Sequence, residues 1–545
     1  MAIRPLIRRA RAVFHRMSAD ETARPVTDRA TEESKQDPIT TNVVPHIGAE
    51  DQQPDIPSED VQHGVRDVEA VTLTWSKTTL MAVFINIWFL YFVNAFQSSV
   101  FYSLSAYVSS SFQSHSLSGL PTALADAFSA AVFLPVAKLM DTWGPLNRGL
   151  AYAFTSSPYI ITAFAGSKVA DEFYYQVSWR WGLGCWAIIF PIVAAPLYFM
   201  LKFNLRKAEK EGHRRKEKSG RTFLQSIWYW FLEFDLIGVV MFTAGLVVFE
   251  LPFDIASEAP NGWGTGYIIA MLVVGFSMLF FFAIYEKWIA LTPLLNFSFL
   301  TDRTVIGACL LDATYQLSYY CWNNYFTSFL QVVNGLTIAE AGYVSNTFDV
   351  VSGVLLLGVG WTIRRTGRFK WLLYIAVPLY IFAQGLMIYF RKPNMSVGYQ
   401  VMCQIFISIG GAIFIIVEQL AILAAVDHQH VAAALALLNV VGTIGDSAGL
   451  TICTAIWTNT YEKALVRYLP VSALNNLENI YEDITVQTSY PIGSATRLAI
   501  QKAYAYAEVR MLSAGLGVMV LAFAWTIMIK DIDLKKVAQV KGTVF

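Results

Sequence analysis

Residues 78–106, TTLMAVFINIWFLYFVNAFQSSVFYSLSA, form an uncharged apolar run that is long enough to cross a bilayer as one helix. Eleven similar runs follow, at about 120–140, 149–166, 180–201, 235–254, 266–286, 303–329, 341–362, 369–390, 398–425, 431–457 and 511–529. Hydrocarbon offers backbone groups no hydrogen-bond partner, so only helices or closed barrels span it, and these runs are too long for barrel strands. We therefore expect an all-α polytopic membrane protein, a helical bundle of about twelve transmembrane helices.

The composition of the 545-residue chain agrees with a membrane protein and argues against several other classes. Hydrophobic residues make up 55% of the chain and charged residues 15%, compared with about 25% charged residues in soluble domains. The 40 basic and 40 acidic residues leave no excess that would bind nucleic acid. The five cysteines lie in apolar stretches, and no phosphate loop, nucleophile elbow or HExxH pattern occurs. We expect no enzyme, no cofactor and no metal site.

The distribution of polar residues divides the chain into six parts. We expect a disordered cytoplasmic tail at 1–74, an N-terminal bundle of four spans at 75–201, a basic cytoplasmic linker at 202–222, two linker spans at 223–290, a C-terminal six-helix bundle at 291–530 and a cytoplasmic tail at 531–545. Within the C-terminal bundle, residues 458–510 are expected to be a long outer loop whose recurring aromatic residues form short amphipathic helices. Five arginines before Asp20 also leave open a mitochondrial transit peptide.

Basic residues set the expected orientation of the spans. Lysines and arginines gather in the run 202–221, beside Lys287 and Arg303, and in the turn 364–370. The connections at 107–119, 251–265 and 330–340 contain none, and Arg391 with Lys392 is the main exception. Because cytoplasmic loops carry the excess of basic residues, both termini are expected in the cytoplasm.

Ionisable residues inside the spans are candidates for function, because a charge is costly in hydrocarbon. Asp126, Asp312, Glu418 and Asp446 lie in the second, seventh, tenth and eleventh runs. Each is either a proton relay or a carboxyl group that only hydrogen-bonds to a neighbouring helix. Asp312 and Glu418 are our candidates for proton coupling.

Polar and aromatic residues recur at helical spacing on several spans. Such faces line a wet cavity or join helices through hydrogen bonds, and their richness in tyrosine and glutamine favours a cavity. The candidates for substrate contact are Gln97, Tyr102, Tyr159, Tyr319 and Trp322.

Six stretches resemble the fungal siderophore-iron transporters of the major facilitator superfamily. They are QSSVFYSLSAYVSSSFQSHSLS from Gln97, NRGLAYAFTSSPYIITAFAG from Asn147, WRWG from Trp179, YYCWNNYF from Tyr319, VEQLAILAAVDHQ from Val417 and SYPIGSATR from Ser489. The resemblance implies proton-coupled uptake of ferric siderophore chelates, across the plasma membrane or from endosomal vesicles. A siderophore already surrounds its iron with oxygen ligands, so the carrier needs no metal ligands of its own. A proton-driven exporter of drugs or toxins and a non-transporting receptor remain alternatives.

The chain departs from this family in its N-terminal bundle. The family is expected to have fourteen helices, but here AKLMDTWG, which ends at Gly144, is followed at once by PLNRGLAYAF. Two helices are therefore expected to be missing, which gives an arrangement of four, two and six spans and a bundle with impaired transport. In the conformational turn of the superfamily, Asp141 and Gly144 are kept and Pro145 replaces an arginine. Arg364, Gly367 and Arg368 keep a similar turn in the second half.

Overall fold

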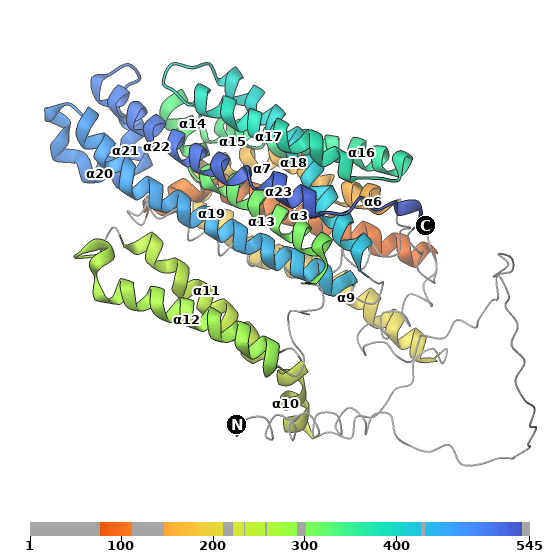
Figure 1. Ribbon diagram of the computed structural model, residues 1–545. Helices are drawn as coiled ribbons and strands as arrows, with labels where there is room; N and C mark the ends of the chain where they lie inside the picture. Colours follow the sequence, from red (N-terminus) through yellow and green to blue (C-terminus); the bar gives the residue numbers. More distant parts are fainter. Residues whose placement is uncertain are drawn as a thin grey trace, which may run out of the picture.

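The computed structural model describes residues 77–111, 147–210, 222–233, 235–256, 259–290, 301–426 and 431–536. These residues form a bundle of helices without strands (Figure 1). Eight helical stretches among them are long and apolar enough to cross a membrane. The all-α polytopic fold is thus confirmed. The count of twelve is not, because the expected span at 120–140, with Asp126, lies outside the described residues, as do the tail 1–74 and residues 537–545.

The first part of the bundle comes from residues 77–210. Its elements are α3 (Lys77–Ser111), α6 (Arg148–Thr155), α7 (Pro158–Glu172), the π-helical turn η3 (Phe173–Val177), α8 (Trp179–Gly184) and α9 (Trp186–Lys210). The run expected at 149–166 is divided because Pro158 begins a new helix, where its missing N–H costs no bond. α9 continues to Lys210, so the linker begins later than residue 202. α3 packs against both α7 and α9.

A separate pair of helices follows the linker. The elements are α10 (Phe223–Glu233), α11 (Leu236–Ile255), the 3-10 turn η4 (Gly262–Gly264) and α12 (Gly266–Trp288). α11 and α12 pack closely on each other. Their main contact with the rest of the protein is between α11 and α19, so this pair of helices lies beside the bundle (Figure 1). At one end, the Tyr285 hydroxyl donates a hydrogen bond of 2.7 Å to the Asp235 carboxylate and joins the two helices.

The second part comes from residues 301–536. Its elements are α13 (Arg303–Asn323), α14 (Phe326–Asn334), α15 (Ile338–Ser345), α16 (Thr347–Thr366), α17 (Lys370–Phe390), α18 (Val397–Ala425), α19 (Val431–Tyr468), η7 (Val471–Asn476), α20 (Leu477–Glu482), α21 (Ile484–Ser489), α22 (Ala495–Met519), α23 (Ala522–Met528) and η8 (Leu534–Lys536). Two expected spans, 303–329 and 341–362, are each replaced by two consecutive helices, with breaks at Asn324–Tyr325 and at Asn346.

The outer loop is much shorter than residues 458–510. α19 continues to Tyr468 and α22 begins at Ala495, so only 469–494 connects them. The helices extend because Tyr461 and Tyr504 belong to one buried aromatic cluster, in which their ring centroids are 4.8 Å apart. The short helices expected in this region are present as η7, α20 and α21.

Small residues bring α19 against α13. A methyl group on Gly445 would overlap the carbonyl oxygen of Ala313, and one on Gly449 would come within 2.7 Å of the Leu317 carbonyl oxygen. Gly442 similarly faces the Asp312 carboxylate. Glycines at one helix face allow this close backbone approach, as is common between helices in membranes.

Candidate functional site

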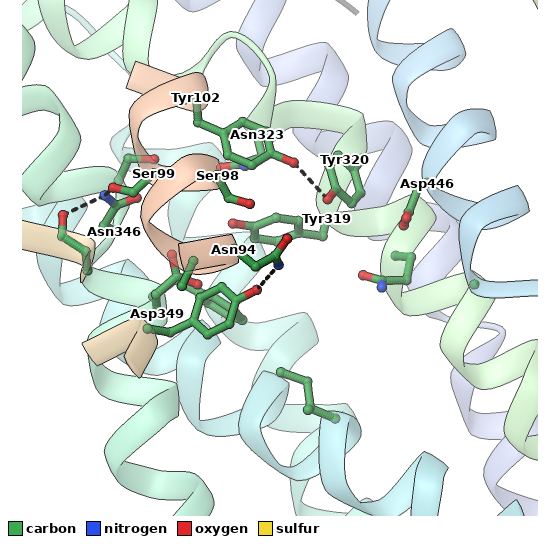
Figure 2. A pocket seen from close by; sticks show the side chains of 18 of the residues that line it. Asn94, Ser98, Ser99, Tyr102, Tyr319, Tyr320, Asn323, Asn346, Asp349 and Asp446 are labelled. Atoms are coloured by element: carbon green, nitrogen blue, oxygen red, sulfur yellow. Dashed lines mark hydrogen bonds between the residues drawn. The ribbon is translucent and has the colours of Figure 1, made fainter. Parts of the chain in front are cut away.

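A cavity of about 340 Å³ lies between the first and second parts of the bundle. Residues from α3, α6 and α7 form one wall, and residues from α13 to α16, α18 and α19 form the other. Figure 2 shows tyrosine, asparagine, serine and aspartate side chains around it. The polar lining residues are Asn94, Ser98, Ser99, Tyr102, Ser105, Tyr152, Tyr159, Thr162, Asp312, Tyr315, Gln316, Tyr319, Tyr320, Asn323, Asn324, Thr327, Ser345, Asn346, Asp349, Asn439, Thr443 and Asp446.

Hydrogen bonds hold several of these side chains in place. The hydroxyls of Tyr102 on α3 and Tyr320 on α13 are 3.2 Å apart, so this bond crosses from one part to the other (Figure 2). The Asn94 amide donates to the Tyr159 hydroxyl over 3.1 Å. The cavity therefore offers hydroxyl and amide groups on rigid helices to a ligand with many polar atoms.

Asn346 closes one end of the cavity. Its side-chain amide donates to the Ser99 hydroxyl at 3.0 Å, the Ala163 carbonyl at 2.8 Å and the Ser167 hydroxyl at 3.0 Å. Asn346 lies at the break between α15 and α16, so one side chain joins the second part to both α3 and α7. We call this end of the bundle, which also holds residues 469–494, the loop end.

Two further contacts between the parts lie nearer to the tip of the loop end. The Tyr107 hydroxyl donates to the side-chain carbonyl of Gln331, and the Ile484 amide donates to the Ser110 hydroxyl over 3.2 Å. Arg497 fixes α14 and the loop to each other, because it donates to the carbonyls of Val332 and Gln487. The loop end is therefore closed.

Three carboxyl groups line the cavity: Asp312, Asp349 and Asp446. Glu418 of α18 lies beside Asp312, is 2% exposed and does not itself line the cavity. The pair thus places one acidic group at the cavity wall and a second directly behind it. Among the described residues, no three histidine, cysteine, aspartate or glutamate side chains gather in a group that could hold a metal ion.

The structure brings only some of the candidate residues together. Tyr102, Tyr159 and Tyr319 line the cavity, and Gln97 and Trp322 do not. Trp322 is fully buried and packs against Tyr319 and Phe326, with ring centroids 5.5 Å away in each case. Asn346 is not among the residues expected from the sequence, where its only signal is an amide inside a predominantly apolar run.

The conformational turn of the second part is held by the C-terminal segment, at the opposite end from the loop end. Gly367 ends α16 with φ at 75°, and its carbonyl accepts from the Leu534 amide at 2.9 Å. Arg368 forms an ion pair of 2.9 Å with Asp531. Arg364 lies in the last turn of α16. Asp141 and Gly144 lie outside the described residues.

A second ion pair anchors the same segment. The Lys530 ammonium lies 2.7 Å from the Asp302 carboxylate. Partial burial raises the pKa of Asp302, but the hydrogen bonds from Lys530 and from the Thr304 amide outweigh it and bring this pKa below its ordinary value.

The two parts differ in the length of chain between helices that pack together. α3 packs against α7, and α13 packs against α19. The chain between α3 and α6, residues 112–147, is about 60 residues shorter than the chain between α14 and α19, residues 335–430, which holds α15–α16, α17 and α18.

No family model matches the chain, but individual proteins do. It is 50% identical to the siderophore iron transporter mirB of Emericella nidulans over 557 aligned positions, which cover 92% of each protein. It is 48% identical to MFS siderochrome iron transporter 1 of Gibberella zeae over 546 positions, which cover 90% of each. A solved bacterial homologue of the human lysosomal transporter Spinster overlaps with a TM-score of 0.40 at 14% identity, covering 85% of this chain and 98% of that one, too low to support a conclusion.

The alignments also contain positions that have no counterpart in this chain. Since 92% of 545 residues is about 501, about 56 of the 557 positions hold residues of the Emericella nidulans protein alone. The same difference, 546 positions against about 490 covered residues, recurs with the Gibberella zeae protein. By its identity to these relatives, the chain belongs to the fungal siderophore iron transporters of the major facilitator superfamily, which are membrane transporters and not enzymes.

Proposed function

We propose that this protein imports ferric siderophore chelates by alternating access, coupled to proton entry. The observation that carries the proposal is the polar and tyrosine-rich cavity between the two parts of the bundle. Relatives that are 50% and 48% identical are named siderophore and siderochrome iron transporters, which supports the same substrate class here.

The chemistry of the cavity suits a chelate better than a bare ion. A ferric siderophore presents a polar shell, and the tyrosine and asparagine side chains can donate and accept hydrogen bonds to it. The cavity volume of about 340 Å³ is at the small end of the range of ligand sites, about 300–1,000 Å³. The bundle must therefore open before a bulky chelate enters, and the Asn346 contacts at the loop end are among those that must break, together with the Tyr107–Gln331 and Ile484–Ser110 hydrogen bonds.

Asp312 and Glu418 are the proposed proton carriers. Asp312 meets the cavity and Glu418 lies behind it, so a proton can reach Glu418 through Asp312. Asp312 also faces the α19 backbone at Gly442, so a change in its charge acts on the contact between α13 and α19. Asp312→Asn and Glu418→Gln should each weaken the pH dependence of uptake. Glu462→Gln, at an exposed acid on α19, is the matched control, and unchanged pH dependence in both variants would reject this assignment.

The transport proposal is tested in fungal cells that lack their own siderophore carriers. Cells that express this chain should accumulate radiolabelled iron from a ferrichrome-type chelate with time, and a protonophore should abolish the accumulation. Surface labelling tests the proposed plasma membrane location with both termini in the cytoplasm. Extrusion of preloaded chelate would instead indicate an exporter. Binding without accumulation would indicate a receptor or a carrier impaired by its missing helices.

A further inference from the structure

A second buried charge pair lies between α17 and α22, away from the cavity. Arg391 ends α17 and Glu508 lies within α22, and both side chains are 0% exposed. The Arg391 Nε atom is 3.9 Å from the nearest Glu508 oxygen. None of the guanidinium nitrogens and neither carboxylate oxygen has a hydrogen-bond partner among the described residues.

This geometry is poor for a pair whose role is stability. Removing two charges from water costs several kcal/mol for each ion, and the cost is recovered only with close contact and further hydrogen bonds. Buried polar groups normally have partners, so five unpartnered atoms in one pair need an explanation. A pair that must break during a conformational cycle explains them, because tight bonds would hold one state.

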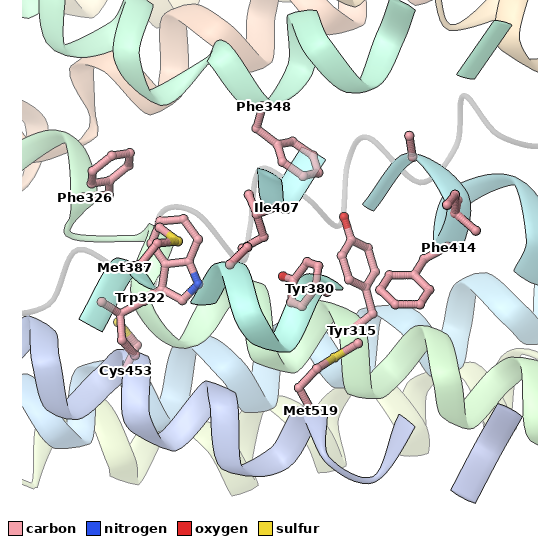
Figure 3. Packing of buried hydrophobic residues seen from close by; sticks show 14 of the residues in the cluster. Tyr315, Trp322, Phe326, Phe348, Tyr380, Met387, Ile407, Phe414, Cys453 and Met519 are labelled. Carbon is pink, nitrogen blue, oxygen red and sulfur yellow. The ribbon is translucent and has the colours of Figure 1, made fainter. Parts of the chain in front are cut away.

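Aromatic rings take the place of hydrogen bonds around Arg391. Its guanidinium carbon lies 3.8 Å from the ring centroid of Phe326, 5.0 Å from that of Phe329 and 5.3 Å from that of Trp322. Figure 3 shows Trp322 and Phe326 in the buried cluster. Ring faces attract a cation, but more weakly than a carboxylate does. These three rings, which we call the aromatic cage, therefore hold Arg391 in place as long as the Glu508 carboxylate is charged.

The surroundings of Glu508 leave it as the group that changes charge. From α18 the thiol of Cys403 lies near Arg391, and on α22 the Tyr504 hydroxyl lies near Glu508. The α19 ring of Tyr461 packs on Tyr504, which also lies near Arg497, while α13 and α14 contribute only the aromatic rings. Phenols, thiols and guanidinium groups keep their protons near neutral pH, so Glu508 is the acid of this cluster that can exchange one there.

We propose that Glu508 is a second proton site of the transport cycle and that Arg391 is its switching partner. Uptake of a proton by the Glu508 carboxylate leaves Arg391 as a buried cation without a counter-ion, which is strongly unfavourable. Arg391 must then leave its aromatic cage, and loss of the proton allows the pair to form again. The inference deepens the proposed transport function and depends on it for the meaning of the cycle.

Two contacts show where such a switch would act. Arg391 borders a hollow of about 280 Å³ together with Lys392, Lys502 and Arg510, so a hollow lined by basic residues adjoins Arg391 on one side. On the other side, Trp322 contacts Tyr319, which lines the cavity. A movement of Arg391 changes the packing of Trp322 and thereby the wall at Tyr319.

Infrared difference spectroscopy on the full-length protein in detergent tests the proton site without any transport. In the Asp312→Asn/Glu418→Gln background, which removes the other proposed proton carriers, lowering the pH should produce the carbonyl absorption of a protonated, buried carboxyl group, and adding Glu508→Gln should remove it. Because Glu508→Gln leaves Arg391 unpaired and can impair folding, the neutral double variant Arg391→Met/Glu508→Gln is measured as well. The exposed pair Lys168→Met/Glu172→Gln is the control and should keep the absorption.

Uptake measurements then test the switch. The double variant should fold and transport but lose part of the pH dependence, whereas a purely structural pair would give the pH profile of the natural protein. In the Asp312→Asn/Glu418→Gln background, an infrared absorption that persists after Glu508→Gln is added, alone or together with Arg391→Met, would overturn the inference, whatever the uptake result. Absence of uptake by the natural chain would count against the proposed function and would leave the infrared result to decide the proton site.

Discussion

Replacement of Asn346 by alanine should open the loop end of the protein. The substitution removes an amide NH₂ group whose two N–H bonds are shared among Ser99, Ala163 and Ser167. At about 1 kcal/mol for each of the two donors, the closed state loses about 2 kcal/mol. Since about 1.4 kcal/mol corresponds to a tenfold change, the ratio of open to closed molecules should rise on the order of 30-fold.

Cysteine labelling measures this shift. Ser98 lines the cavity beneath the Asn346 contacts, so a Ser98→Cys side chain should react with a membrane-impermeant maleimide when the loop end opens. The background carries Cys185→Ala, because the other four native cysteines are buried. Asn459→Ala is the control, since the Asn459 amide bonds only to a carbonyl within α19. If the Ser98→Cys side chain reacts at the same rate with Asn346 and with alanine at position 346, the contacts of Asn346 do not keep the loop end closed.

Three other predictions concern packing, pH and the missing segment. Gly445→Ala should destabilise the protein by about 1–3 kcal/mol in thermal unfolding, because the methyl group overlaps the Ala313 backbone, whereas Gly517→Ala, which meets nothing within 4 Å, should have little effect. Lys530→Met should lower the free energy of unfolding by less than about 1 kcal/mol. Because the pKa of Asp302 is lowered on folding, this loss of stability should be present at neutral pH and vanish as the pH falls below about 3.9. A loss of stability that grows in acid would contradict this prediction. Two helices are expected to be missing after Gly144, so insertion there of the corresponding Emericella nidulans segment should raise the uptake rate and the melting temperature, and unchanged values would contradict this expectation.

The long apolar runs were sufficient to predict the spans but not their interruptions. The runs stay predominantly apolar whether or not the helix continues, so the pattern does not mark the breaks at Asn324–Tyr325 and Asn346. The same limit affected 458–510, where aromatic spacing predicted helices but not their continuity with α19 and α22. Continuity is decided by tertiary packing, here by the contact between Tyr461 and Tyr504.

The sequence was sufficient to predict a polar, tyrosine-rich cavity but not which residues line it. Tyr319 and Trp322 are three positions apart and lie on nearly the same helix face, yet only Tyr319 meets the cavity. α13 is surrounded by packed helices, including α18, α19 and α22, so polar and aromatic residues occur on more than one of its sides. The glycines of α19 bring the α13 backbone close at Ala313 and Leu317, and such a contact between distant segments cannot be read from the spacing within α13.

The acidic groups proposed for proton coupling all lie in the second part of the bundle, whereas both parts line the cavity. Asp312 and Glu418 lie on α13 and α18, and Glu508 lies on α22, all within the second part. Among the described residues of the first part, the acids of α7 and α9 lie near the helix ends, and this part supplies polar but uncharged side chains to the cavity wall. Loss of two helices from the first part would therefore weaken binding of the chelate while the proton sites remain. We accordingly expect the shortened chain to keep its pH-dependent infrared changes even where uptake is slow, and insertion of the missing segment to raise uptake without altering them.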